Sequence, residues 1–164
     1  METIFSIAKD HEMYLRVLVS VVLGFVIGWD REAKNKPAGL KTYMYVCVAS
    51  TLITLISIYS VDKYGEMNNL IRMDPMRLTA QIVAGLGFLG AGVILKDGIQ
   101  VKGLTSAAMI LFAGGVGIGI GAGFYGIVIF SVIISLLLAK VASFVEKKKT
   151  GRLNEQINDQ EMGA

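Results

Sequence analysis

Long apolar runs, separated by short polar segments, set the pattern of this chain. The five runs cover approximately residues 13–29, 43–59, 80–95, 104–123 and 124–144. Each is close to the ~20 residues with which a helix crosses the apolar part of a bilayer. The pattern therefore predicts an all-α fold, a polytopic transmembrane helix bundle of about five spans. We assign residues 1–146 to this transmembrane domain and residues 147–164 to a polar tail.

The composition agrees with a membrane protein. Of the 164 residues, 54% are hydrophobic and 18% are charged, and the mean hydropathy is +0.60. A soluble domain of this size has too little interior for so many apolar side chains, so lipid must be their solvent. The net charge of +3 is spread over several loops, which argues against nucleic acid as a partner. The only histidine, His11, has no serine or cysteine partner arrangement, so an enzyme is not expected.

The lysines and arginines predict the orientation, because cytoplasmic loops of membrane proteins carry an excess of both. With five spans, the loops after the first and third runs and the C-terminal tail lie on one side. That side holds eleven of the sixteen basic residues. We therefore expect the N-terminus outside and the C-terminus, with the polar tail, in the cytoplasm. Charged residues and Pro37 follow the first run in place of a small-residue cleavage site, so we read it as a retained helix.

Small residues recur within the apolar runs and predict where helices pack, because helices in lipid associate through small residues and hydrogen bonds. The glycines expected to pack are Gly85, Gly87, Gly90, Gly92, Gly115, Gly119 and Gly123. Three of them also match G-x-G-x-x-G, but their apolar surroundings lack the strand and acid of a dinucleotide site. In the second run, one face of small polar residues is expected to point into the bundle: Cys47, Ser50, Thr51, Thr54 and Ser57.

The third run begins with polar residues that can carry function. Asp74 and Pro75 predict the N-cap and the first position of a helix. From there, one helical face carries Arg77, Gln81, Gly85 and Phe88. This face should meet another helix, because an arginine and an amide that face lipid would be costly. The alternative is that Arg77 reaches the outer surface while Gln81 bonds a neighbouring backbone carbonyl.

Four motifs stand in order between residues 24 and 126. They are Asp30-Arg31 followed by Ala38-Gly39-Leu40-Lys41-Thr42; Asp74-Pro75-Met76-Arg77 with Ala80-Gln81; Gly85-Leu-Gly-Phe-Leu-Gly-Ala-Gly92; and Val101-Lys-Gly-Leu-Thr-Ser-Ala-Ala108 leading to Gly121-Ala-Gly-Phe-Tyr125. With these motifs the chain resembles the MgtC/SapB family, including its YhiD-like members. Asp30 stands where the family usually has glutamate, and Lys41 where it usually has arginine. Because the tail after residue 146 is short, we expect the C-terminal soluble domain of longer members to be absent.

The resemblance implies a multi-pass protein of the bacterial plasma membrane that is connected with growth under magnesium limitation, and in some members with acid stress or virulence. It implies no settled activity, because members have been regarded as magnesium transporters and also as modulators of other membrane machines, including ATP synthase. No cofactor is assigned on this basis, and Mg²⁺ is the one candidate.

One function consistent with these residues is a cation conduit. Magnesium prefers carboxylate ligands, and the candidate metal ligands are Asp30 and Asp74. The predicted topology places them on opposite sides of the membrane, so they cannot share one site. Five helices without an even repeat make a poor transporter alone, so a pore would need a homo-oligomer.

The rival function is regulation through docking on a membrane-protein partner, and we favour it over transport. Its support is the density of small-residue stripes and the charged cytoplasmic loop. Two functional clusters are expected. The cytoplasmic cluster holds Asp30, Arg31, Lys41 and Thr42. The cluster at the outer end of the third helix holds Asp74, Arg77 and Gln81.

Overall fold

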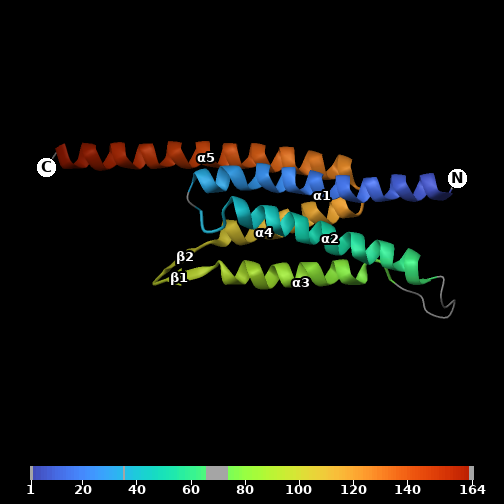
Figure 1. Cartoon of the computed structure of the whole chain (residues 1–164). Helices are drawn as coiled ribbons and strands as arrows, with labels where there is room; N and C mark the ends of the chain where they lie inside the picture. The colour runs from blue at the N-terminus through green and yellow to red at the C-terminus, as the bar shows by residue number, and fades with distance from the viewer. Residues whose placement is uncertain (1, 35, 66–73, 163–164) are drawn as a thin grey trace. The chain divides into compact units, whose positions relative to one another are not determined.

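The computed structural model describes residues 2–34, 36–65 and 74–162, which form five helices and one β-hairpin (Figure 1). The elements are α1 (Glu2–Ala33), α2 (Leu40–Gly65), α3 (Arg77–Gly92), β1 (Leu95–Asp97), β2 (Gln100–Lys102), α4 (Leu104–Gly121) and α5 (Tyr125–Met162). The helical fold is confirmed. The hairpin between α3 and α4 is the exception, because the third apolar run was expected to stay helical as far as residue 95.

Four of these helices are long and apolar enough to cross a membrane, so the chain is a multi-pass membrane protein. The candidate spans are His11–Ala33, Leu40–Val61, Leu104–Gly121 and Tyr125–Val145. α3 has only 16 residues and is about 24 Å long at 1.5 Å per residue, which is short of the ~30 Å apolar layer. By length and composition the described residues thus contain four spans where the pattern predicted about five.

The chain divides into two compact units, Met1–Val128 and Ile129–Ala164. The first unit holds α1 to α4, the hairpin and the first turn of α5. The second unit is the remainder of α5, which continues as one helix to Met162. Residues 147–162 of the predicted polar tail, residues 147–164, continue this helix, and residues 163–164 lie outside the described residues.

Within the first unit, α2 packs against both α1 and α4, and α3 lies beside α2 and α4 (Figure 1). The polar face predicted for α2 is buried: Cys47, Ser50, Thr51, Thr54 and Ser57 are each at most 4% exposed. The Cys47 thiol donates a hydrogen bond to the Ala113 carbonyl at 3.2 Å. One turn later, the Thr51 hydroxyl donates to the Gly117 carbonyl at 2.9 Å. The prediction that this face points into the bundle is confirmed.

Glycines bring the backbones of these helices into contact. A Cβ added at Gly24 or Gly28 of α1 would lie 2.8 Å from the Cα of Met44 or 2.7 Å from the Cα of Leu40 in α2. A Cβ added at Gly117 of α4 would collide with the Cys47 carbonyl oxygen. α1, α2 and α4 therefore approach too closely at these points for any side chain to fit.

The glycines predicted to pack fall into two groups. Close neighbours exist for Gly90, Gly119 and Gly123. An added Cβ at Gly90 would be 3.6 Å from the Ala107 side chain, and one at Gly119 would collide with Val128. In the described part of the chain, nothing lies within 4 Å of a Cβ added at Gly85, Gly87, Gly92 or Gly115. A packing role for these four glycines therefore stays a prediction, because no neighbour within the described residues approaches them.

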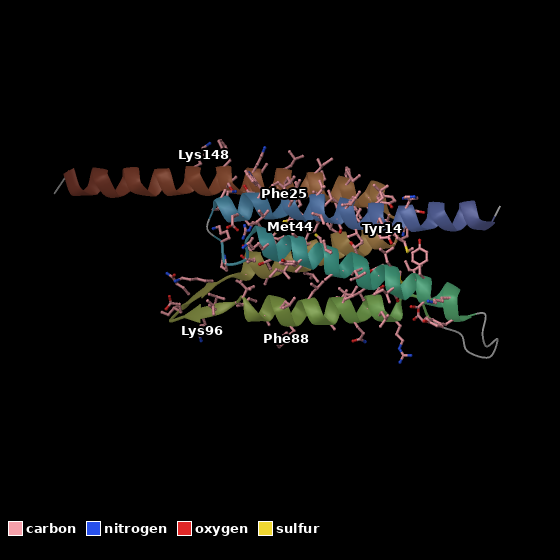
Figure 2. The ribbon with its side chains drawn as sticks, viewed as in Figure 1. Tyr14, Phe25, Met44, Phe88, Lys96 and Lys148 are labelled. Carbon is pink, nitrogen blue, oxygen red and sulfur yellow. The ribbon has the colours of Figure 1, made fainter. Side chains whose placement is uncertain are left out.

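α3 departs from its predicted start and from its predicted packing face. It begins at Arg77 after an N-cap at Met76 that makes no side-chain cap hydrogen bond. The Asp74 carboxylate instead accepts a hydrogen bond from the Met76 backbone N–H at 2.8 Å, which forms a turn before the helix. The buried face of α3 holds Thr79, Ile82, Leu86 and Gly90. The face expected to meet another helix, with Arg77, Gln81, Gly85 and Phe88, is exposed, and Figure 2 shows Phe88 on the outer side of α3.

The hairpin joins α3 to α4 through a tight turn. β1 and β2 are antiparallel, with Leu95 opposite Lys102 and Asp97 opposite Gln100. Gly98 in the turn has a φ of 61°, a value that glycine adopts without strain. Lys102 forms an exposed ion pair with Asp97 at 2.7 Å.

Candidate functional site

Two arginines of α1 contact the opposite ends of α4, and they define the two ends of the first unit. Arg31 reaches Ser106 in the first turn of α4, and Arg16 reaches Gly121 in the last turn. We call residues 30–43 and 94–106 the Arg31 end. We call residues 12–16, 57–61, 74–77 and 119–125 the Arg16 end. Figure 1 shows the α1–α2 loop and the hairpin together at one end of this unit.

At the Arg31 end, Arg31 lies in the last turn of α1. Its Nη2 donates a hydrogen bond to Ser106 Oγ at 3.1 Å. Ser106 is 1% exposed, and Tyr43, whose hydroxyl faces Arg31 and Ser106, is fully buried. Arg31 Nε has no hydrogen-bond partner among the described residues. The Arg31 guanidinium and the Tyr43 and Ser106 hydroxyls therefore form one buried polar cluster beside the start of α4.

The predicted cytoplasmic cluster lies at this end, but its members do not bind one another. Asp30 forms an ion pair with Lys34, one turn further along α1, at 2.8 Å. Arg31 is directed to α4 instead. Lys41 and Thr42 are exposed at the start of α2. The structure thus places the four residues at one end of the first unit without assembling them into one site.

Glu32 has a structural role that the sequence pattern did not reveal. Its Oε2 accepts a hydrogen bond from the backbone N–H of Leu40, the first residue of α2, at 2.8 Å. The carboxylate therefore caps the N-terminus of α2 and places a negative charge at the positive end of that helix. Eight residues separate the two partners, so no capping motif of adjacent residues signals this contact.

Replacing Glu32 by alanine is expected to destabilise the protein by about 1 kcal/mol, the typical value of an N-cap. The matched control is Asp30→Ala in the same turn of α1. It removes only an exposed ion pair, whose loss costs about 0.2–1 kcal/mol. The free energy of unfolding, measured by SDS titration in mixed micelles, checks both variants. A smaller loss for Glu32→Ala than for Asp30→Ala would contradict the capping role.

At the Arg16 end, Arg16 holds the turn between α4 and α5. Its Nη1 donates to the Gly121 carbonyl at 2.6 Å, and its Nη2 pairs with Glu12 at 2.6 Å. The guanidinium carbon also lies 6.0 Å from the centre of the Tyr125 ring. Carbonyls in the last turn of a helix lack intrahelical partners and carry partial negative charge. A cation with only 12% of its side chain exposed therefore caps α4. The sequence signal was an arginine inside an apolar run, with a glutamate four residues before it.

The predicted outer cluster, Asp74, Arg77 and Gln81, also lies toward the Arg16 end. The Ser57 hydroxyl donates to the Pro75 carbonyl at 2.5 Å and joins the start of this segment to α2. Asp74, Arg77 and Gln81 are all exposed. Within the ranges that the structure describes, no ion pair joins Asp74 to Arg77. These residues therefore share one short segment of the surface rather than a closed site.

A groove runs between α2 and α3. Its volume is about 460 Å³, and it is lined almost entirely by apolar side chains such as Tyr45, Ile53 and Leu89. Ser50 and Gln81 are its polar lining residues. Gly85 adds an open stretch of backbone to the α3 wall. Gln81 is thus placed at the edge of an apolar surface rather than in the core.

The carboxylates do not converge in the described residues. In that part of the chain, no three or more His, Cys, Asp or Glu side chains lie close enough together to hold a metal ion. Asp30 belongs to the Arg31 end and Asp74 to the Arg16 end. The two candidate metal ligands therefore lie at opposite ends of the first unit and cannot share an ion.

The sequence of this chain is similar to those of known proteins. The model of the MgtC family matches residues 17–148. Protein SapB of Bacillus subtilis is 43% identical over 143 residues, which is 85% of this chain and 60% of that protein. The Escherichia coli K12 protein named "Putative magnesium transporter YhiD" is 33% identical over 130 residues, which is 79% of this chain and 60% of that protein.

A third relative, Protein MgtC of Brucella abortus, is 35% identical over 130 residues, which is 76% of this chain and 50% of that protein. The chain thus spans about half to three fifths of the length of these three relatives. No solved structure matches it. The matched region contains Arg31, Ser106 and the whole of α2, α3 and α4. The chain belongs to the MgtC family.

Proposed function

We propose that this protein acts in adaptation to low magnesium by modulating a membrane partner, and that it does not itself carry the ion. The connection with magnesium rests on the family and on the printed name of the Escherichia coli relative. The preference for regulation rests on one observation, the closed interior between α2 and α4.

The polar groups of this interior are occupied by helix packing. The Cys47 thiol and the Thr51 hydroxyl donate to carbonyls of α4, so they are not free to line a path. A Cβ added at Gly121 would lie 2.9 Å from the Thr51 carbonyl, so even a methyl group lacks room there. Ion pathways usually carry ionisable residues within the membrane. In the first unit the candidate carboxylates are at its two ends, which favours a packing role for the interior.

We propose that all five helices cross the membrane. The Arg31 end then lies in the cytoplasm, and the N-terminus lies outside. The residues at that end carry an excess of lysine and arginine, as cytoplasmic loops do. α3 is short, but it lies beside α2 and α4 between the same two ends of the unit (Figure 1). The exposed Lys41 and Thr42 at the Arg31 end then form part of a charged cytoplasmic surface for a partner.

Growth and magnesium uptake, measured in the same cells, test this function. Without the protein, growth in low magnesium should fall, while the initial rate of Mg²⁺ uptake per cell stays within twofold of that of the wild type. Lys41→Ala should weaken growth without changing the amount of protein, because it alters only the proposed cytoplasmic surface. An initial uptake rate that rises in proportion to the amount of protein would contradict regulation and favour transport.

One observation supports the alternative, an oligomeric magnesium or other cation conduit. α3 exposes Gln81 and Gly85 along the groove with α2. An amide that faces lipid lacks hydrogen-bond partners, and polar residues of this kind join helices in membranes. In a homo-oligomer, this face of α3 would meet a second copy and could line a shared axis. The uptake experiment distinguishes this alternative from regulation.

A further inference from the structure

We propose that the groove between α2 and α3 binds one molecule of phosphatidylethanolamine, with an acyl chain in the groove and the headgroup at Asp74 and Arg77. The groove has a volume of about 460 Å³, and its lining is almost wholly apolar. Its α2 wall runs from Tyr45 to Ile53, inside the candidate span Leu40–Val61. The groove therefore faces the acyl chains of the bilayer rather than water.

The dimensions of the groove fit one acyl chain. Its α3 wall runs from Leu78 to Leu89, which is about 17 Å at 1.5 Å per residue. One leaflet of the ~30 Å apolar layer is about 15 Å deep, so the groove is as long as an acyl chain of one leaflet. Over this length, a volume of about 460 Å³ gives a mean cross-section of about 27 Å². A helix of a second copy, about 10–12 Å wide with its side chains, has roughly three times that cross-section or more.

Two opposite charges lie at the mouth of the groove. Asp74 and Arg77 are exposed just before Leu78, where the α3 wall begins. Within the described residues, neither side chain forms an ion pair. A phosphatidylethanolamine headgroup complements both charges, because its phosphate accepts from a guanidinium and its ammonium donates to a carboxylate. Phosphatidylglycerol has no ammonium, and the quaternary ammonium of phosphatidylcholine has no N–H to donate.

The mouth lies near the membrane boundary at the Arg16 end. The Ser57 hydroxyl donates to the Pro75 carbonyl at 2.5 Å and so fixes the segment before α3 to α2. Thr54, one turn before Ser57, lies beside the end of α4, because a Cβ added at Gly121 would be 2.8 Å from the Thr54 Cβ. With α3 in the membrane, as proposed above, its start is therefore within about one turn of the end of a spanning helix. Polar headgroups begin at this depth.

Gln81 lies between the charged mouth and the apolar part of the groove. Its exposed amide lines the groove one turn after Arg77. An amide in the apolar layer needs a hydrogen-bond partner, and the ester carbonyls of a phospholipid lie between its headgroup and its acyl chains. Further along α3, Gly85 and Leu89 line the groove. This side of α3 therefore changes in the same order as the lipid, from phosphate to ester to acyl chain.

Lipid retained by the full-length protein in native mass spectrometry tests this proposal. The protein is delipidated in detergent and titrated with phosphatidylethanolamine, phosphatidylglycerol or phosphatidylcholine of identical acyl chains. The wild type should retain one phosphatidylethanolamine, with at least threefold higher affinity than for either other lipid. Its thermal melting temperature should rise with the concentration of this lipid. Equal retention of the three lipids, or no retention by the folded wild type, would overturn the proposal.

Gly85→Leu and Gly87→Leu form a matched pair that tests the groove. In the described part of the chain, a Cβ added at either glycine meets no neighbour within 4 Å, but of the two only Gly85 lines the groove. Gly85→Leu should fill the groove and weaken retention of phosphatidylethanolamine at least tenfold, whereas Gly87→Leu should change it less than twofold. Equal retention by the two variants would overturn the proposal. A protein dimer that forms without lipid and is lost only in Gly85→Leu would identify a second copy as the occupant and would also overturn it.

Asp74→Asn and Arg77→Gln test the headgroup contacts, and both positions are exposed, so they decide the matter even if Gly85→Leu fails to fold. Asp74→Asn removes only the partner of the ammonium. It should abolish the preference for phosphatidylethanolamine over phosphatidylcholine and leave the affinity for phosphatidylcholine within twofold of the wild-type value. Arg77→Gln removes the partner of the phosphate and should weaken retention of all three lipids at least threefold. An unchanged preference in Asp74→Asn, or unchanged retention in Arg77→Gln, would overturn the proposal.

Discussion

Gly117→Ala is expected to destabilise the protein by about 3 kcal/mol, the upper part of the usual range for overpacking a core. The added methyl group would collide with the Cys47 carbonyl oxygen and lie 2.7 Å from the Ser50 Cβ. Both belong to α2, and a backbone carbonyl cannot turn away as a flexible side chain can. The helices must therefore separate, which would also weaken the hydrogen bonds from Cys47 and Thr51 to α4.

The matched control is Gly115→Ala, two residues earlier in the same helix. Nothing in the described part of the chain lies within 4 Å of a Cβ at Gly115. Alanine is a better helix former than glycine by about 1 kcal/mol, so this variant should be as stable as the wild type or more stable. The free energy of unfolding in mixed micelles compares the two variants. Similar losses in both would mean that α2 and α4 do not meet as described.

Arg16→Gln should be the second large loss, about 2–3 kcal/mol, because a hydrogen bond to a charged group contributes about 1.5–3 kcal/mol. The substitution removes the cation that binds the Gly121 carbonyl and leaves Glu12 without its partner. Arg16→Lys keeps the charge but has no planar fork to reach both acceptors, so we expect an intermediate loss. The same unfolding titration measures all three proteins.

Arg77→Gln at the same end is the control for loss of an arginine as such. Arg77 is exposed, and substitutions at exposed positions without special contacts usually change stability by less than about 0.5 kcal/mol. If Arg77→Gln destabilised the protein as much as Arg16→Gln does, the capping role of Arg16 would be refuted.

The positions of the helices could be predicted from the apolar runs, because lipid selects for continuous apolar segments of bilayer length. The run at residues 43–59 lies wholly within α2, and its polar face is buried as expected. The run at residues 80–95 extends past the end of α3 into β1. The two-residue loop Gly98-Ile99, with glycine first, fits a hairpin turn, but the residues before the hairpin are as apolar as a helix and conceal the boundary.

The packing face of α3 could not be predicted from its periodicity. Spacing shows which residues share a face but not which face a neighbouring helix covers. Two faces of α3 carry small residues, and the one with Gly90 meets α4, while the one with Gly85 is open. The outcome is decided by residues on other helices, such as Ala107 opposite Gly90.

The candidate site was predicted only in part for a related reason. Arg31 was singled out, but its partner Ser106 is 75 positions away in the sequence, and Gly121 is 105 positions from Arg16. Local patterns contain no information about pairs at such separations. The charges that looked like one cluster from Asp30 to Thr42 are in fact divided between an ion pair along α1, a cap on α2 and a contact with α4.

Magnesium flux through the purified protein tests the central claim, regulation without transport, most directly. Liposomes that contain the protein and an internal Mg²⁺-sensitive dye are compared with protein-free liposomes, after the melting temperature has shown that the protein is folded. An Asp74→Asn variant is measured beside them. We predict that all three preparations take up Mg²⁺ at the same rate. Faster uptake with the wild-type protein, lost in Asp74→Asn, would contradict the account and establish a conduit.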